Sequence, residues 1–387
     1  MKYPGTISSK LPRVGTTIFT VMSALAQDHG AINLSQGFPD FDGYPELIDL
    51  IHSYMKKGMN QYAPMPGILP LRNALAEKMN GLYGCSIDPE TEITITSGGT
   101  QAIYTAITAM VREGDEVVVI EPAYDCYVPA IELAGGIPVF VQLRSSDQTI
   151  DWESVRRVLT AKTRMIIVNT PHNPTGSVMT AEDMKQLERL VAKTEITIIS
   201  DEVYEHILFD GRTHESVLRY PKLAERTFAV YSFGKTYHAT GWKTGYCIAP
   251  ENLMREFRRV HQFLVFSANT PIQYALTDFL SNRSYLELPG FFQKKRDKFL
   301  ELIAGTAFKY RPAGGSYFQL LNYSAITDEK DTDFAVRLTR EAGIASIPVS
   351  VFYRKAPNDT LLRFCFAKKD ETLERAAERL HKVIATI

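Results

Sequence analysis

The sequence of 387 residues has few cysteines, almost no net charge and no long apolar run. Its four cysteines lie far apart without a C-x-x-C pair, and neither H-E-x-x-H nor H-x-x-E-H occurs, so we expect no disulfide and no metal site. The formal net charge of -1 argues against binding to nucleic acid or to an anionic membrane. No apolar run approaches the ~20 residues of a membrane span, and the N-terminus lacks the apolar core of a signal peptide. These absences predict a cytoplasmic protein whose partners are small molecules.

Short apolar runs and helical patterns alternate from Glu92 onward. This alternation is typical of an α/β fold, in which a mostly parallel sheet is covered by helices on both faces. We expect seven strands near residues 93–96, 117–121, 137–142, 165–169, 196–200, 228–233 and 245–249, with helices near 100–112, 124–134, 151–160 and 180–193.

A second group of elements follows a long helical region after Glu251. It consists of expected strands at 317–321 and 361–367 and helices at 331–342 and 370–385, which indicates a smaller α/β domain. The predicted division has three parts: an N-terminal arm with part of the small domain at 1–44, a large domain at 45–285 and a C-terminal small domain at 286–387.

The stretch 226–250 has the pattern of strand, loop and strand, and its loop contains Ser232, Lys235 and Lys243. Burial of Lys235 at the end of an apolar strand, beside a second cation, would lower the pKa of its amine and make it a nucleophile. A small-residue loop with a hydroxyl and two lysines suits a phosphorylated aldehyde that condenses with one of them. The alternative is a solvated loop between two strands.

Polar residues also follow other strands, and ligands of open α/β sheets bind beyond the carboxyl ends of the strands. Gly99 and Thr100 begin an expected helix whose free amides suit a phosphate, although an ordinary turn also explains the glycines. Asn173 precedes a proline, which favours an extended backbone with a free side-chain amide, but N-P-T-G alone makes a turn.

Two charged residues in apolar strands need partners. Asp201 ends the strand of I-T-I-I-S-D-E-V-Y, and either a protonated ring nitrogen or a role as helix cap would satisfy its carboxylate. Tyr204, three residues later, lies on the same side in a helical turn. Arg363, in L-L-R-F-C-F-A, suits a planar carboxylate, which is either that of a substrate or that of an internal ion pair.

Taken together and in this order, the motifs resemble those of the fold-type-I pyridoxal-phosphate enzymes, in particular the class I/II aminotransferases. The resemblance extends from S-Q-G-F-P-D to L-R-F-C-F-A-K, and N-P-T-G, S-D-E-V-Y and S-F-G-K-T-Y...G-W-K-T-G are specific in combination. Within the family, the sequence is most similar to the branch of methionine, glutamine and kynurenine aminotransferases. The resemblance implies pyridoxal 5′-phosphate as cofactor, an amino acid and a 2-oxo acid as substrates, and a homodimer with shared active sites.

The resemblance also implies a role for individual residues. Lys235 would bind the coenzyme aldehyde covalently and later move the substrate's proton, while Asp201 would keep the pyridine nitrogen protonated. Tyr204 and Asn173 would hydrogen-bond the phenolic oxygen of the ring. The remaining implied contacts are Tyr124 on the ring face, Gly99, Thr100, Ser232 and Lys243 at the phosphate, Tyr62 at the phosphate of the neighbouring subunit, and Gly37, Asn173 and Arg363 at the substrate α-carboxylate. Lys243 stands where many relatives have arginine.

An absence predicts the class of substrate side chain. Aspartate-specific relatives have an arginine shortly before the N-T-P motif, which is at 269–271 here, but this chain has none after Arg259. Phe19 and Tyr104 are expected to add apolar walls. We therefore expect methionine, aromatic amino acids or kynurenine as amino donors, with glutamine as a further candidate.

Two other functions fit parts of this pattern. A pyridoxal-phosphate β-lyase acting on cysteine conjugates would need nearly the same site. A ligand-sensing domain of a transcription regulator can share the fold, but it follows a basic DNA-binding domain, for which the residues before the expected helix at Thr16 leave no room.

Overall fold

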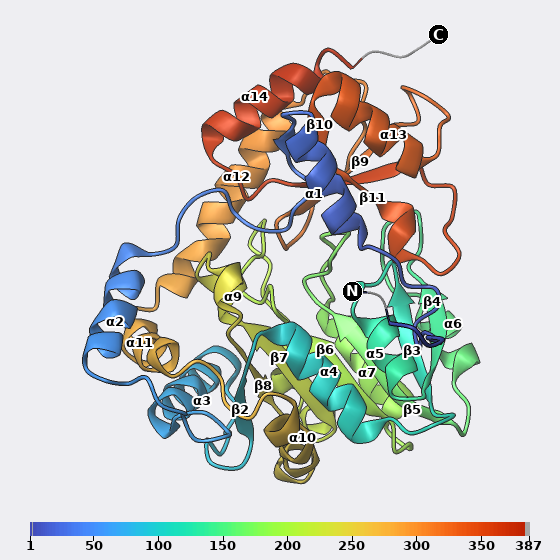
Figure 1. Cartoon of the computed structure of the whole chain (residues 1–387). Helices are drawn as coiled ribbons and strands as arrows, with labels where there is room; N and C mark the ends of the chain where they lie inside the picture. Colours follow the sequence, from blue (N-terminus) through green and yellow to red (C-terminus); the bar gives the residue numbers. More distant parts are fainter. Residues whose placement is uncertain (2, 384–387) are drawn as a thin grey trace.

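The computed structural model describes residues 1 and 3–383, and a seven-stranded sheet lies at the centre of its larger part (Figure 1). The strand order is β2-β8-β7-β6-β5-β3-β4, and only β8 runs antiparallel to the other strands of this sheet. The strands are β2 (Ile93–Thr96), β3 (Glu116–Glu121), β4 (Ile137–Gln142), β5 (Thr163–Asn169), β6 (Thr197–Asp201), β7 (Thr227–Ser232) and β8 (Gly245–Ile248). The expected mostly parallel sheet of an α/β fold is confirmed.

Apolar side chains on both faces of the sheet explain why helices cover it on both sides. Successive side chains of a strand point to opposite faces, so Val117 and Val119 join one apolar cluster while Val118 and Ile120 join the other. The first cluster is closed by α4 (Gly99–Met110), α5 (Tyr127–Leu133) and α10 (Glu251–Leu264). The second includes residues of α2 (Pro45–Lys56), α3 (Leu69–Tyr83), α6 (Trp152–Val158), α7 (Ala181–Val191), α8 (Pro221–Ala224) and α11 (Thr270–Leu280).

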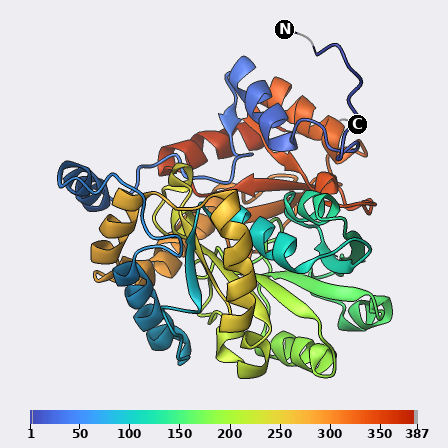
Figure 2. The same cartoon turned by 60° about the horizontal axis from the view of Figure 1, so that its bottom comes forward.

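The smaller part contains two short sheets and lies against the carboxyl ends of the large sheet (Figures 1 and 2). An antiparallel sheet has the order β11-β12-β9, and β1 pairs with β10 in parallel. The elements of the smaller part are α1 (Ile18–Asp28), β1 (Ile32–Asn33), α12 (Leu288–Leu302), β9 (Phe318–Asn322), α13 (Asp331–Arg337), β10 (Ile344–Ala345), β11 (Ile347–Pro348), β12 (Leu361–Cys365) and α14 (Asp370–Leu380). The expected smaller α/β unit is present, and the boundaries after residues 44 and 285 stay predictions.

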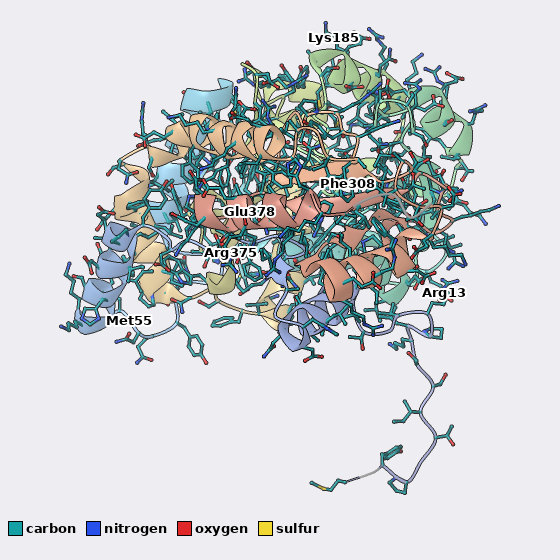
Figure 3. All side chains as sticks on the ribbon, turned by 90° about the horizontal axis from the view of Figure 1, so that it is seen from above. Arg13, Met55, Lys185, Phe308, Arg375 and Glu378 are labelled. Atoms are coloured by element: carbon teal, nitrogen blue, oxygen red, sulfur yellow. The ribbon has the colours of Figure 1, made fainter. Side chains whose placement is uncertain are left out.

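Helix α14 shows how amphipathic helices close this smaller part. Leu373 and Ala377 are buried, whereas Arg375 and Glu378, labelled in Figure 3, are on its solvent side. Apolar residues spaced three to four apart place one stripe against the core and leave the charged stripe in water. No helix among residues 1 and 3–383 is long and apolar enough to cross a membrane.

Several expected boundaries were wrong, each for a local reason. The loop expected after β7 begins with a short helix, α9 (Phe233–Thr236), followed by a 3-10 turn at Thr240–Trp242. The helix expected at 331–342 is α-helical only to Arg337 and then widens into a π-helix at Leu338–Ala342. Gly343 follows it as the C-cap, and its φ of 69° favours glycine. The strand expected at 361–367 ends at Cys365, because its neighbour β9 begins opposite that residue. Residues 384 and 385 of the last expected helix lie outside the described residues.

Candidate active site

A cavity of about 320 Å³ lies at the carboxyl ends of β5, β6 and β7, where the large sheet meets the smaller part of the molecule. The cavity brings together most of the predicted site residues, from segments far apart in the sequence. Those that line it are Phe19, Gly37, Gly99, Thr100, Tyr124, Asn173, Asp201, Tyr204, Ser232, Lys235, Lys243 and Arg363. This position agrees with the rule that ligands of open α/β sheets bind beyond the carboxyl ends of the strands.

Lys235 lies on α9, directly after β7, and its side chain points into the cavity. Its Nζ donates hydrogen bonds to the carbonyl oxygen of Gly37 (3.2 Å) and to the hydroxyl of Tyr317 (3.0 Å). Burial lowers the pKa of Lys235 to about 8, and the neighbouring cations Lys243 and Arg363 act in the same direction. Near neutral pH a much larger fraction of this amine is therefore neutral than of an ordinary lysine.

Asp201 is the last residue of β6 and is almost completely buried. Its Oδ2 accepts a hydrogen bond from the hydroxyl of Tyr127 (2.6 Å), and its Oδ1 accepts a longer one from the amide of Val203 (3.4 Å). Burial raises the pKa of Asp201 to about 6, although the Tyr127 hydrogen bond opposes this shift. The site thus contains a buried carboxylate that is hydrogen-bonded on both oxygens and carries its charge above a pH of about 6.

Arg363 lies on β12 and is fully buried. It donates to Oδ1 of Asn173 (2.8 Å) and to the carbonyl of Ser35 (2.7 Å), and its guanidinium lies 4.0 Å from the centroid of the Phe318 ring. Its Nε is buried without a hydrogen-bond partner. Among the described residues it forms no ion pair within 4.0 Å, so the internal ion pair considered from the sequence is not what holds it. The guanidinium retains donor capacity for a carboxylate that enters the cavity.

The start of α4 lines the cavity with backbone amides that have no hydrogen-bond partner among the described residues. Gly98 has a φ of 81°, and the first hydrogen bond of the helix is donated by the amide of Ala102 to the carbonyl of Gly98 (3.3 Å). The amides of Gly99 and Thr100 precede that bond and therefore have no partner within the helix. A Cβ at Gly98 would lie 3.5 Å from Nζ of Lys243, so the lysine is next to these amides. This arrangement suits an anion.

Two predicted residues do not line the cavity, Tyr62 and Tyr104. Tyr62 is 83% exposed and stands edge-on to Phe266, with ring centroids 5.5 Å apart. The prediction for Tyr62 concerned the neighbouring subunit, which a single chain does not test. Tyr104 was expected to form an apolar wall of the cavity, but it is not among the lining residues. The apolar residues that line the cavity include Phe38 and Ile103.

Sequence reasoning missed two tyrosines that contact the central charged groups. Tyr127 donates to Asp201, and Tyr317 contacts Lys235 and the carbonyl of Gly37 (2.6 Å). Both are almost completely buried, and neither carries a charge that would mark it in the sequence as part of a site. The E-P-A-Y-D-C-Y motif contains Tyr127 and was the one available signal for it.

The sequence model of the family "Aminotransferase class I and II" matches residues 29–380, which include every residue that lines the cavity except Phe19. The chain belongs to the class I and II aminotransferases. The enzyme class that the sequence motifs predicted is therefore confirmed.

Known relatives of this aminotransferase match along almost the whole chain. It is 50% identical to the methionine aminotransferase of Escherichia coli over 97% of this chain and 98% of that protein. It is 35% identical to a kynurenine–oxoglutarate transaminase of Dictyostelium discoideum over 99% and 98% of the two chains. The crystal structure of an Escherichia coli protein identified as a methionine aminotransferase superposes with a TM-score of 0.96, at 50% identity and with 98% and 100% coverage.

Proposed function

We propose that this aminotransferase uses pyridoxal 5′-phosphate and moves the amino group of an apolar, thioether or aromatic L-amino acid, with methionine foremost, to a 2-oxo acid. The observation that carries the proposal is the pairing, across one cavity, of Lys235, whose amine has a lowered pKa, with the buried carboxylate of Asp201. A perturbed amine and a perturbed carboxylate in one cavity are typical of a catalytic site. The 50% identity to a methionine aminotransferase supports the choice of donor.

The residues present fit this coenzyme at three points. The neutral amine of Lys235 suits its aldehyde, and Asp201 suits a protonated ring nitrogen, which would supply the cation that this carboxylate lacks. Amides at the start of α4, with Lys243, suit its phosphate. Further donors toward the ring and the phosphate would be Tyr204, Asn173, Thr100 and Ser232, and Tyr124 would cover one ring face.

When bound, the coenzyme supplies an electron sink that stabilises negative charge at the substrate's Cα. The part of this chain is to place a base beside that atom. Once released, Lys235 would take the proton from Cα as a neutral amine. It would then give this proton to C4′ of the coenzyme. Burial raises the pKa of Tyr204, so its hydroxyl stays protonated and remains a hydrogen-bond donor.

The substrate α-carboxylate would bind at Arg363, whose Nε has no partner among the described residues. Asn173 holds one guanidinium nitrogen through Oδ1, which leaves the Nδ2 of the same amide as a donor into the cavity. Gly37, two residues after the Ser35 carbonyl that holds Arg363, also lines the cavity. The site therefore fits a carboxylate bound in the plane of a pre-oriented arginine.

Replacing Arg363 by lysine tests this carboxylate site. Lysine keeps the positive charge but lacks the planar pair of donors, so we expect kcat/KM for methionine to fall about 10²-fold, mainly through KM. Steady-state kinetics with the amino acid and with its amine analogue, which lacks the carboxylate, measure the effect. A similar loss for both substrates would contradict carboxylate recognition by Arg363.

Apolar side chains next to the carboxylate site favour an apolar donor. Phe19, Phe38 and Ile103 line the cavity, and the sequence between Arg259 and Asn269 contains no arginine for a second carboxylate. An unpaired distal carboxylate in such surroundings would be costly to desolvate. The side-chain pocket therefore favours methionine and aromatic amino acids over aspartate.

A panel of amino acids added to the loaded enzyme tests the proposed donors. Each donor that gives up its amino group converts the coenzyme to its amine form and bleaches the visible absorption. We expect kcat/KM for methionine to exceed that for aspartate by at least about 10²-fold, because aspartate would bury a charge without a partner. A preference for aspartate would overturn the proposed donor class, whereas the absence of bleaching with every donor would overturn the proposed reaction.

A homodimer with shared sites is part of the proposal. Tyr62 is 83% exposed and Phe263 is 88% exposed, and Leu264 and Phe266 lie near them with large exposed fractions. Exposed aromatic groups in one region of a surface are typical of protein interfaces. A second copy that covered this region would place Tyr62 toward the phosphate site of its partner, as in the family the sequence resembles.

A further inference from the structure

Tyr317 is a buried tyrosine whose hydroxyl contacts the reactive amine. It lies just before β9, and its ring packs against Tyr204, Phe318 and Phe292 at centroid distances of 5.1, 5.0 and 5.8 Å. Packing alone would be satisfied by phenylalanine. The hydroxyl, however, lies 3.0 Å from Nζ of Lys235 and 2.6 Å from the carbonyl oxygen of Gly37.

We propose that the hydroxyl of Tyr317 and the carbonyl of Gly37 form a docking site that holds the free amine of Lys235 in both of its charge states. The inference rests on the proposed role of Lys235 as the residue that binds the coenzyme and moves the proton. It adds Tyr317, which contacts the reacting nitrogen directly, to the residues that serve the reaction.

The hydrogen-bond geometry suits the ammonium form first. Lys235 donates to Tyr317 (3.0 Å) and to Gly37 (3.2 Å), while the Tyr317 proton is donated to the same carbonyl of Gly37. A carbonyl oxygen has two lone pairs and can accept both bonds. The charged amine therefore has two acceptors in a site where burial makes an unsatisfied ammonium costly.

The same atoms suit the neutral amine after a rotation of one hydroxyl. A neutral amine has a lone pair, and the Tyr317 hydroxyl can turn its proton toward it while Lys235 still donates to Gly37. Burial raises the pKa of Tyr317 well above its usual value, so the hydroxyl remains neutral and able to donate. No heavy atom has to move when the amine gains or loses its proton.

Other titratable and charged groups surround the amine of Lys235 and also influence its pKa. These groups are Asp201 at the end of β6, Lys243 after the 3-10 turn, Arg363 and Cys365 on β12, and Tyr204. Lys243 and Arg363 lower the pKa of Lys235, and Asp201 and Cys365 raise it. Among the described residues, Nζ of Lys235 donates hydrogen bonds to Tyr317 and Gly37 alone. Loss of the Tyr317 hydroxyl should therefore be felt directly at the amine.

The docking site joins the lysine to the segment that receives the substrate. Gly37 supplies the carbonyl for Lys235, and Ser35, two residues earlier, supplies the carbonyl for Arg363. Residues 35–37 thus place the free amine and the carboxylate-binding guanidinium relative to one another. An amine released by the substrate would be kept within reach of Cα rather than dispersed among rotamers.

The first test uses the coenzyme-free protein and reads Tyr317 itself. Tyrosine labelled with ¹³C at Cζ is followed by NMR across pH 5–10 in the wild type and in Lys235→Met. We expect a tyrosine resonance that persists in Tyr204→Phe to titrate with a midpoint near the pKa of about 8 of Lys235, and to be flat in K235M. A wild-type spectrum in which no tyrosine responds in this way would overturn the docking site. The result is independent of coenzyme binding and of turnover.

The second test measures how fast pyridoxal phosphate attaches to Tyr317→Phe at different pH values, since only the neutral amine reacts. Without the hydroxyl both forms of the amine lose a hydrogen bond, but the bond of the ammonium is the stronger one because it involves a charge. We therefore expect the pKa of Lys235 to fall by about one pH unit and attachment at pH ~6–7 to become roughly five- to tenfold faster than in the wild type. At pH values above both pKa values the rates should converge.

Tyr237→Phe is the matched control, because this hydroxyl is buried without a hydrogen-bond partner among residues 1 and 3–383 and Tyr237 does not line the cavity. Its pH profile should superpose on that of the wild type. A Y317F profile that also superposes would overturn the proposal, and the NMR test applies unchanged should Y317F not fold. If no variant and not even the wild type attaches the coenzyme, the proposed function fails instead, whatever the NMR titration shows.

Discussion

Replacing Lys235 by alanine is expected to abolish transamination while the coenzyme stays bound without a covalent link. The alanine removes the nucleophile that attaches the coenzyme and the base that moves the Cα proton, and the second loss alone is expected to lower kcat by at least about 10⁴-fold. The carboxylate of Asp201 and the amides at the start of α4 are unchanged, so the coenzyme retains two of its anchors. Borohydride reduction followed by peptide mapping should label Lys235 in the wild type and no lysine in K235A.

Lys243→Gln is the informative companion to K235A. Lys243 lines the same cavity, but the proposal gives it only a charge at the phosphate. The variant should therefore weaken coenzyme affinity by about tenfold or more and still be labelled at Lys235 by borohydride. Turnover in K235A comparable to that of K243Q, or borohydride labelling at position 243, would show that the wrong lysine has been assigned. Addition of a small primary amine should restore part of the activity of K235A, since the amine can occupy the space of the missing side chain.

The sequence predicts much of the large sheet because its strands are apolar on both faces. Runs such as Val117–Ile120 bury every residue and cannot stand at an exposed surface, and the helical patterns between them require crossovers. The predicted strands also gave the positions of their carboxyl ends. Asp201, Asn173 and Lys235 follow or end such strands, so the sequence placed them at one edge of the sheet. Two-residue strands such as β10 and β11 are too short to leave a pattern, and the structure was needed to locate them.

The site was less predictable wherever its chemistry depends on contacts between distant segments. The contact of Tyr317 with Lys235 joins residues 82 apart, and that of Tyr127 with Asp201 joins residues 74 apart. In the sequence each tyrosine has the appearance of a core residue, and only the three-dimensional position of the hydroxyl distinguishes it. The alternatives for Arg363 were equally open, because an ion pair depends on whether any carboxylate folds against it.

Replacing Asp201 by asparagine is expected to be the most damaging change that keeps the shape of the site. In the wild type the buried carboxylate is ionised above a pH of about 6, and a cationic ring nitrogen beside it would oppose the effect of burial and bring its pKa down. Asparagine occupies the same volume but offers no charge, so a ring nitrogen beside it would lose its proton and its capacity to accept electrons. We expect kcat to fall by about 10³-fold or more, with a weaker affinity for the coenzyme.

Asp201→Glu separates the charge from the shape. Glutamate keeps the carboxylate but displaces it from the Tyr127 hydroxyl, which donates to Oδ2 of Asp201 at 2.6 Å in the wild type. If the charge is what matters, D201E should retain far more activity than D201N, and ¹⁵N-labelled coenzyme should give a protonated ring-nitrogen signal in D201E and an unprotonated one in D201N. Equal losses in the two variants with a protonated nitrogen in both would mean that Asp201 acts through the packing of the turn at 201–204. The electrostatic assignment would then have to move to another group, and among the described residues no other carboxylate lines the cavity.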